Sequence, residues 1–181
     1  MNVTEKNLPV IMTRANLDNS PEFEPPSGFS LRWYQPDDEA HWLRIHLAAD
    51  HLNEITPELF QRQFGSDEKL LRERQCYLSD PHGDVIGTGT AWFNNNFDGA
   101  RWGRVHWVAI IPEFQGRGLG KALMTAICRR LPELGHQRAY LTTSTARVPA
   151  IKLYLKFGFE PLIRSVEDES LWRELVLLAK G

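Results

Sequence analysis

The segment Gln115–Lys121 (QGRGLGK) has the composition of a phosphate-binding turn. It follows an apolar run typical of a buried strand, 105–111, and it precedes an amphipathic run, 119–131. Glycines let the backbone approach an anion closely, and the free amides at a helix N-terminus point at it. Arg117 and Lys121 add positive charge beside those amides. The pattern therefore predicts a site for a phosphorylated ligand between a strand and a helix.

Spacing excludes two familiar phosphate loops. A Walker loop needs a glycine five residues before its Gly-Lys pair and a Ser or Thr after it, but these positions are Gln115 and Ala122. The dinucleotide fingerprint G-x-G-x-x-G needs a third glycine where this chain has Lys121. Neither a magnesium nucleotide site nor a dinucleotide site is predicted.

A second block, 149–159, ends in Tyr-x-x-x-Gly-Phe. Together the two blocks resemble the GCN5-related N-acetyltransferase (GNAT) superfamily. Gln115, Gly118 and Gly120 match its Q/R-x-x-G-x-G/A signature, and the later block is similar to its A-x-x-L-Y-x-x-x-G-F segment. The resemblance extends over roughly residues 29–178. A flexible turn beside a core tyrosine is the structural alternative, and the joint spacing of the two blocks disfavours it.

The resemblance implies both a fold and a reaction. The fold is α/β (α+β): a mixed, mostly antiparallel central sheet of about six to seven strands, flanked by helices and splayed between two central parallel strands. The activity is that of an N-acetyltransferase, which moves an acetyl group from acetyl-CoA to a primary amine of a small molecule or peptide by direct attack. Alternatives with the same fold are a longer acyl-CoA, an alcohol acceptor, or a catalytically silent acyl-CoA-binding module.

The resemblance also assigns the acetyl-CoA site. The family pairs the pantetheine arm with the strand before the turn, here Val108, Ala109 and Ile110, much as another strand would pair. The oxyanion contact is expected from the Ile110 amide. Arg147 stands where the family often has Asn, and its side chain is expected to reach phosphate or ribose. Arg117 is expected either to contact phosphate or to be a solvent-exposed charge. The pyrophosphate is assigned to the turn residues Gln115, Gly116, Arg117, Gly118, Leu119, Gly120 and Lys121.

Acetyl transfer to an amine needs a base for the amine and an acid for the departing thiolate. An amine with a pKa of ~10.4 is neutral in roughly one molecule per thousand near pH 7. Tyr154 matches the family tyrosine near the cofactor sulfur, so it is expected to be the acid; packing against Phe157 and Phe159 is the alternative. Retention of such groups favours catalysis over binding alone.

His106 is expected to be the base. Strand alternation predicts that it shares a face with Val108 and Ile110, and its imidazole titrates near neutral pH. It lies nine residues before Gln115, as in some relatives, including the arylalkylamine acetyltransferases. Others carry Glu two positions earlier, where this chain has Arg104. A structural histidine is the alternative, and Asp98 and Glu113 are reserve candidates.

The acceptor pocket of the family forms from the first helices, the loop after the third strand and the late strands. The residues expected there are mostly aromatic or polar. They are interpreted either as the lining of a pocket for an aromatic or apolar amine, in which Asp98 could hold an ammonium, or as core residues. The predicted lining is Trp33, Tyr34, His46, Trp92, Phe93, Asn94 and Asp98.

Bulk properties narrow the class further. One domain of 181 residues with 42% hydrophobic residues can bury a core, and a net charge of −2 with a pI near 6.3 disfavours nucleic acid as a partner. Two cysteines, no signal peptide and no membrane-spanning apolar run predict a cytoplasmic protein without a membrane partner. His41, His46 and His51 have the wrong spacing for a helical metal site, so no metal is expected. A homodimer is compatible with the resemblance.

The chain is divided into a Pro-rich N-terminal extension, 1–28, and an acetyltransferase domain, 29–181. The extension is expected to be an extended leader or partly disordered. A loop is expected at 94–99, and the final segment, 169–178, is expected to be a strand rather than a short helix. Other strands are predicted at 29–34, 75–79, 85–93, 104–111, 139–145 and 159–166, with helices beginning near 36, 56, 66, 119 and 149.

Overall fold

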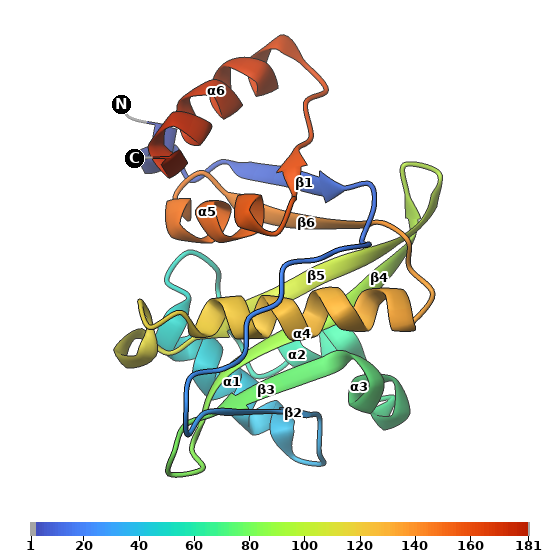
Figure 1. Ribbon diagram of the computed structural model, residues 1–181, viewed down its shortest axis with the longest axis vertical. Helices are drawn as coiled ribbons and strands as arrows, with labels where there is room; N and C mark the ends of the chain where they lie inside the picture. The colour runs from blue at the N-terminus through green and yellow to red at the C-terminus, as the bar shows by residue number, and fades with distance from the viewer. Residues whose placement is uncertain (1–2, 181) are drawn as a thin grey trace.

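The computed structural model describes residues 3–180 and contains one seven-stranded sheet in the order β2-β3-β4-β5-β6-β1-β7 (Figure 1). Strands β5 and β6 run parallel, and the other neighbours are antiparallel. The strands are β1 (Pro9–Arg14), β2 (Ser30–Trp33), β3 (Gln75–Ser79), β4 (Val85–Phe97), β5 (Ala100–Ile110), β6 (Ala139–Ser144) and β7 (Glu160–Pro161).

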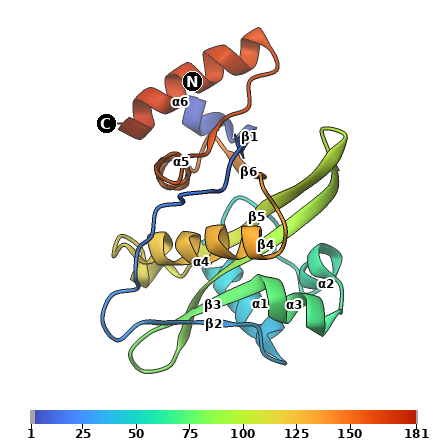
Figure 2. The same cartoon turned by 45° about the vertical axis from the view of Figure 1, so that its right-hand side comes forward.

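Helices cover both faces of the sheet. They are α1 (Asp38–Ala49), α2 (Leu59–Phe64), α3 (Glu68–Arg74), α4 (Leu119–Glu133), α5 (Val148–Lys156) and α6 (Val166–Lys180), with short 3-10 turns η1 (Val3–Lys6) and η2 (Pro112–Phe114). Helices α4 and α5 lie on one face and α1 and α2 on the other (Figures 1 and 2). Helix α4 packs against its face of the sheet through side chains that recur every four residues and are fully buried: Leu119, Leu123, Ile127 and Leu131.

The predicted N-terminal extension supplies a strand of the sheet. Strand β1 lies between β6 and β7 and is antiparallel to both, with Met12 buried at its centre. The following segment crosses α4 as it returns to β2 on the far side of the sheet (Figure 1). The extension is therefore part of the domain core.

The strand predicted over 169–178 is wrong, because this segment lies within helix α6. Trp172, Leu175 and Ala179 are spaced by three and four residues and are buried, which is a helical pattern. The neighbouring place beside β6 is taken by β1. The strand predicted at 159–166 is likewise reduced to the two residues of β7.

The loop predicted at 94–99 is also mostly strand. Asn94 pairs with Trp102 and Phe97 with Ala100, so β4 and β5 form a long hairpin. The turn is confined to Asp98 and Gly99, both with positive φ (50° and 74°), as a two-residue hairpin turn requires. Three consecutive asparagines suggested a loop, but cross-strand pairing outweighs their weak strand propensity.

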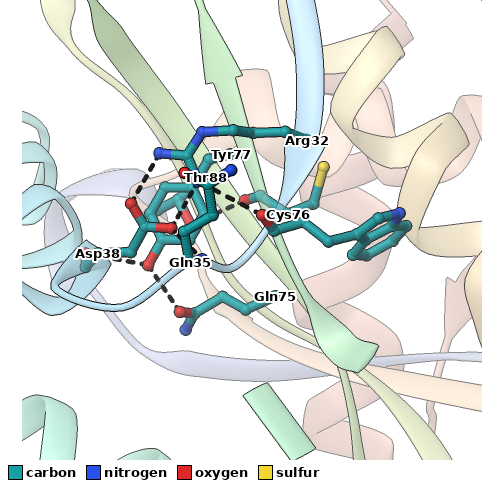
Figure 3. Close-up of polar contacts among 8 residues, drawn as sticks. Arg32, Gln35, Asp38, Gln75, Cys76, Tyr77 and Thr88 are labelled. Carbon is teal, nitrogen blue, oxygen red and sulfur yellow. Dashed lines mark hydrogen bonds and ion pairs between the residues drawn. The ribbon is translucent and has the colours of Figure 1, made fainter. Parts of the chain in front are cut away.

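A buried polar network anchors the start of α1 to the sheet (Figure 3). Asp38 accepts two hydrogen bonds from the Arg32 guanidinium, at 2.6 and 2.7 Å, and one from the Gln35 backbone N–H at 2.6 Å. The Tyr77 hydroxyl lies 3.1 Å from the Asp38 carbonyl oxygen and 2.6 Å from Gln75 Oε1. Because α1 is fixed at this end, its other end is held over β5, where His46 and Asp50 lie.

Candidate active site

The central feature is a gap between the two parallel strands. Strands β5 and β6 pair at Gly103↔Ala139 and Arg104↔Tyr140, and their register ends there. Strand β5 continues to Ile110 along β4, and β6 continues along β1. The strands therefore diverge, and the edge of β5 beyond Arg104 faces the gap, which is visible in Figure 1. This is the splay that the sequence resemblance implied.

Backbone groups of β5 face this gap in alternation. The Ile111 N–H donates to the Ile86 carbonyl of β4 at 2.9 Å. In a strand the backbone groups of neighbouring residues point to opposite edges, so those of Ile110 and Val108 point toward β6. The Gln115 side chain donates to the Ile110 carbonyl at 2.8 Å and ties the turn to the strand end. An extended amide ligand can hydrogen-bond along this edge.

The glycine turn sits at the end of the same strand. Gly116 and Gly118 have φ of 76° and 80°, and a Cβ at either would meet no atom within 4 Å. Gly118 caps α4 without a side-chain hydrogen bond. The Lys121 N–H donates to the Gly118 carbonyl at 3.0 Å, and the Leu119 and Gly120 amides of the first turn remain available to an anion. Gly120 has a different role, because a Cβ there would lie 3.2 Å from Leu153 of α5.

The two basic residues of the turn make contacts that the sequence did not indicate. The Arg117 guanidinium donates to the Glu113 carbonyl at 3.0 Å and stacks on Phe114. The Lys121 ammonium lies 5.4 Å from the Phe23 ring centroid, and Lys156 of α5 lies 5.1 Å from the same ring. The N-terminal segment thus reaches the cationic rim of the turn.

A β-bulge changes the face on which His106 lies. Thr88 pairs with Ala109 and Thr90 with His106, so β5 has one extra residue, and Trp107 has a φ of 50°. His106 and Trp107 both face α1 and α2, whereas Val108 packs with the core on the α4 side. The prediction that His106 shares a face with Val108 and Ile110 is wrong, because strict alternation fails at the bulge.

Gln63 of α2 determines the tautomer of His106. Its Oε1 lies 3.0 Å from Trp107 Nε1 and 2.9 Å from His106 Nε2. An indole nitrogen can only donate, so the Gln63 oxygen faces both rings, and His106 Nε2 must carry a proton to bond it. Nδ1 then holds the lone pair. The sequence did not reveal Gln63, which is distant in the chain and carries no motif.

Burial keeps two histidines of this face neutral. Burial lowers the pKa of His106 well below its usual value, and the charge of Arg104 and the nearby His46 lower it further. Burial also lowers the pKa of His46 to about 4, against an opposing effect of Asp50. His46 packs between Trp42 and Trp107, with ring centroids 4.3 and 5.0 Å away. Both imidazoles are therefore uncharged near pH 7.

Tyr154 lies on α5, the helix that flanks the gap on the β6 side. It packs edge-on against Phe159, with ring centroids 6.4 Å apart. Burial raises the pKa of its phenol to about 12, partly offset by the positive charge of Arg147. The phenol therefore keeps its proton at neutral pH, which is the form that a proton donor needs.

Arg147 forms an ion pair across the mouth of the gap. Its Nη2 lies 2.7 Å from Asp50 Oδ1 at the end of α1. Burial opposes ionisation of Asp50, but hydrogen bonds from Leu52 and Asn53, with the Arg147 charge, lower its pKa. The side chain expected to reach phosphate or ribose is thus engaged with the end of α1 instead.

The residues predicted for the acceptor pocket are dispersed. His46 lies beside Trp107 in the aromatic cluster on the α1 and α2 face of the sheet, and Trp92 joins this cluster by packing against Phe64. Phe93 stacks between Trp92 and His136, and Tyr34 is buried against Tyr77.

Three other predicted positions are remote from that cluster. Trp33 packs on the α4 side under Arg130, on the opposite face from His46. Asn94 hydrogen-bonds the Tyr140 hydroxyl, and Asp98 is ion-paired with Arg164 at the hairpin tip. The expectation that these residues form one pocket is therefore wrong.

Comparison with known proteins gives a consistent family. Residues 31–159 match the model of the acetyltransferase (GNAT) family. Mycothiol acetyltransferase from Pseudarthrobacter chlorophenolicus is 33% identical over 153 residues, covering 82% of this chain and 47% of the relative. The enzyme of the same name from Saccharomonospora viridis is 33% identical over 157 residues, covering 78% and 49%. The chain thus spans about half the length of these relatives.

Solved structures agree on the fold. A GCN5-related N-acetyltransferase from Sphaerobacter thermophilus superposes with a TM-score of 0.70 at 21% identity, covering 85% of this chain and 48% of that one. This confirms the predicted fold, including the parallel central pair. Among the described residues, no helix is long and apolar enough to cross a membrane.

Proposed function

Since the chain belongs to the acetyltransferase (GNAT) family, as its motifs predicted, we propose that it transfers the acetyl group of acetyl-CoA to the primary amine of a small molecule. One observation carries the proposal: the uncapped glycine turn at the start of α4 adjoins the gap between β5 and β6. The turn suits a pyrophosphate, and the β5 edge suits the amide-bearing pantetheine arm. Acetyl-CoA then enters as the donor substrate.

The turn and the strand edge have separate tasks in this proposal. Amides of the turn and of the first turn of α4 bind the pyrophosphate oxygens. Val108 and Ile110 align the pantetheine arm, so that the thioester lies between β5 and α5. The Ile110 N–H, on the gap edge, stabilises the carbonyl oxygen as it becomes negative. The Arg147–Asp50 pair links the two sides of the gap rather than binding phosphate in the free protein.

The proton steps use groups on opposite sides of the gap. The amine nitrogen attacks the thioester carbonyl carbon, and the carbon–sulfur bond breaks. His106 accepts the amine proton at Nδ1, because Nε2–H is held by Gln63. Tyr154 donates its proton to the departing CoA thiolate, and the two residues exchange protons with solvent before the next cycle. A neutral imidazole and a protonated phenol are the required starting forms.

A small-molecule acceptor is favoured by two observations. The curated relatives are named for mycothiol, a small molecule, although this chain spans about half of their length. The acceptor face is also compact: α1, α2 and β5 bring aromatic rings close to His106, with Phe64 at 5.6 Å and Trp107 at 5.9 Å between ring centroids. Precursors of mycothiol are therefore the first acceptors to test.

The test is acetyl transfer to a panel of amines: cysteine-bearing amines, amino sugars, polyamines and peptide N-termini. Acetylated product is measured by mass spectrometry, because a thiol-bearing acceptor would itself react with a thiol dye. We expect turnover with a small amine and none with the His106→Gln/Tyr154→Phe double variant. Tight acetyl-CoA binding without transfer to any amine would instead indicate a binding module. Faster turnover with a longer acyl-CoA would change the donor.

A further inference from the structure

A second polar site lies at the other end of α4. Arg74 at the end of α3, Arg101 at the start of β5, and His136 and Arg138 before β6 meet there. We call this cluster the arginine pocket. Helix α4 separates it from the glycine turn by about 20 Å, at 1.5 Å per residue, so it is distinct from the proposed acetyl-CoA site.

Beside this cluster the surface forms an open pocket of about 380 Å³, within the size range of small-molecule sites, ~300–1,000 Å³, and Arg74 lies behind it rather than in its lining. Arg101, His136, Gln137 and Arg138 line it. Aromatic rings hold the guanidinium groups in place. Arg74 and Arg101 lie 4.6 and 4.9 Å from the Phe93 centroid, and Arg138 lies 4.4 Å from that of Trp102. The cationic groups are therefore preorganised.

Arg74 is the unusual member, because it is a buried cation. It is 4% exposed, and its Nη1 donates to the Ala91 carbonyl at 3.0 Å and lies 3.4 Å from His136 Nε2. Its Nε is buried and has no hydrogen-bond partner among the described residues. A buried charge is normally paired, and leaving it unpaired costs stability.

Among the residues that the structure describes, no carboxylate lies within ion-pair distance of the cluster. Across residues 3–179, the arginines in ion pairs are Arg32, Arg72, Arg130, Arg147, Arg164 and Arg173, and none belongs to the pocket. The exposed Glu73 acts on Arg74 only at longer range, and Glu133 is paired with Arg130. Positive charge thus accumulates here in a chain whose net charge is −2.

We propose that the arginine pocket binds a small anion through phosphate or carboxylate oxygens. The guanidinium groups of Arg101 and Arg138, which line the cavity, present paired N–H donors that match these oxygens. The charge of a bound anion would also offset that of the buried Arg74, which lies against His136. Because His136 Nε2 faces the Arg74 donor, its neutral ring offers Nδ1–H as a further donor. The inference concerns binding alone and does not depend on the proposed acetyl transfer.

The test measures binding of inorganic phosphate and of citrate by calorimetry and thermal unfolding. Saturating CoA is present, so that the glycine turn cannot account for the signal. We expect affinity to fall at least about tenfold in the Arg101→Gln/Arg138→Gln variant. The matched control, Arg129→Gln/Arg173→Gln, removes two exposed arginines that do not line the pocket, one near the same end of α4 and one in a surface ion pair of α6, and it should bind as the wild type does. The preferred anion identifies the phosphate or carboxylate source.

Three results would overturn the proposal. The first is no binding of either anion to the wild type up to about 10 mM. The second is an equal response in the pocket variant and the control, which would indicate a general salt effect. The third is retention of an oligonucleotide without any response to phosphate or citrate, which would assign the cluster to a polyanionic partner.

Discussion

The two sides of the gap are built from different parts of the chain. In the proposed function, the donor side consists of backbone groups: the amides of the glycine turn and the edge of β5 between Val108 and Ile110. The acceptor side consists of side chains from α1, α2 and β5, with Gln63 bonding Trp107 across 44 residues of sequence. A backbone site tolerates change in most side chains, whereas a side-chain site changes with each substitution. The proposal therefore assigns specificity to the acceptor side.

The strongest challenge to the donor side is Gly118→Asp. Gly118 has a φ of 80°, and open space adjoins its Cα where the pyrophosphate is proposed to lie. The substitution strains the backbone and places a negative charge there, so acetyl-CoA affinity should fall by about 10³-fold, which is the loss of two or so charge-assisted hydrogen bonds. Isothermal titration calorimetry on the folded variant measures this.

Gly99→Asp is the matched control. Gly99 has a φ of 74° and equally open surroundings, but it lies at the tip of the β4–β5 hairpin. It should lose similar stability while keeping its acetyl-CoA affinity. Unchanged affinity in Gly118→Asp would show that the turn does not bind the pyrophosphate.

Tyr154→Phe tests the donor side of the chemistry. The variant keeps the ring and its packing on Phe159 but removes the hydroxyl. Turnover should fall about 10–10³-fold when chemistry limits the rate, because the thiolate loses its proton donor, while acetyl-CoA binding changes little. Tyr140→Phe, which removes a hydroxyl bonded to Asn94, is the control. A wild-type turnover number for Tyr154→Phe would reduce this residue to a packing role.

The strand, glycine turn and helix to which the donor side is assigned could be predicted from the sequence, because their determinants are local. A glycine turn, the strand before it and the helix after it are contiguous, and the family motif covers Gln115 to Gly120. The mixed sheet and its parallel pair followed from the same resemblance. The N-terminal strand did not, because β1 pairs with segments far along the chain, and a short apolar run carries no signal for that pairing.

The acceptor side could not be predicted, because it depends on a backbone bulge and on contacts between segments that are distant in the sequence. The bulge at Trp107 reverses the alternation on which the placement of His106 depended, and a positive φ at tryptophan has no sequence signature. Gln63 has a role only because α2 crosses β5. Trp33 was predicted to line the pocket because it is aromatic, but it packs on the α4 face of the sheet, opposite the face that carries His46.

Acid sensitivity tests the packing of the acceptor side. Burial lowers the pKa of His46 from 6.5 to about 4, so the unfolded state binds the extra proton between these pH values. The contribution of His46 to the free energy of unfolding is therefore greatest above pH 6.5. It decreases as the pH falls, by about 3 kcal/mol in total at pH 4. His46→Leu should flatten this part of the curve.

Urea unfolding at several pH values between 7 and 4 measures the effect. His51→Leu, which removes an exposed histidine just after α1, provides the control and should retain the wild-type slope. An unaltered slope in His46→Leu would mean that His46 is solvated enough to titrate in the folded state.

The finest test of the comparison is Gln63→Glu, which changes one atom type on the acceptor side. If His106 is the base, kcat/KM is high where the imidazole is neutral and falls as pH drops through its pKa, which burial places well below the usual value. A carboxylate at position 63 would still accept from Trp107 and His106, and it would stabilise the imidazolium. The acidic limb should therefore move up by about one pH unit. Gln61→Glu adds the same charge to an exposed position of α2 and should leave the limb in place, while His106→Gln should abolish it. An unmoved limb in Gln63→Glu, or an equal shift in Gln61→Glu, would separate the Gln63 contact from the chemistry and assign the base to another group.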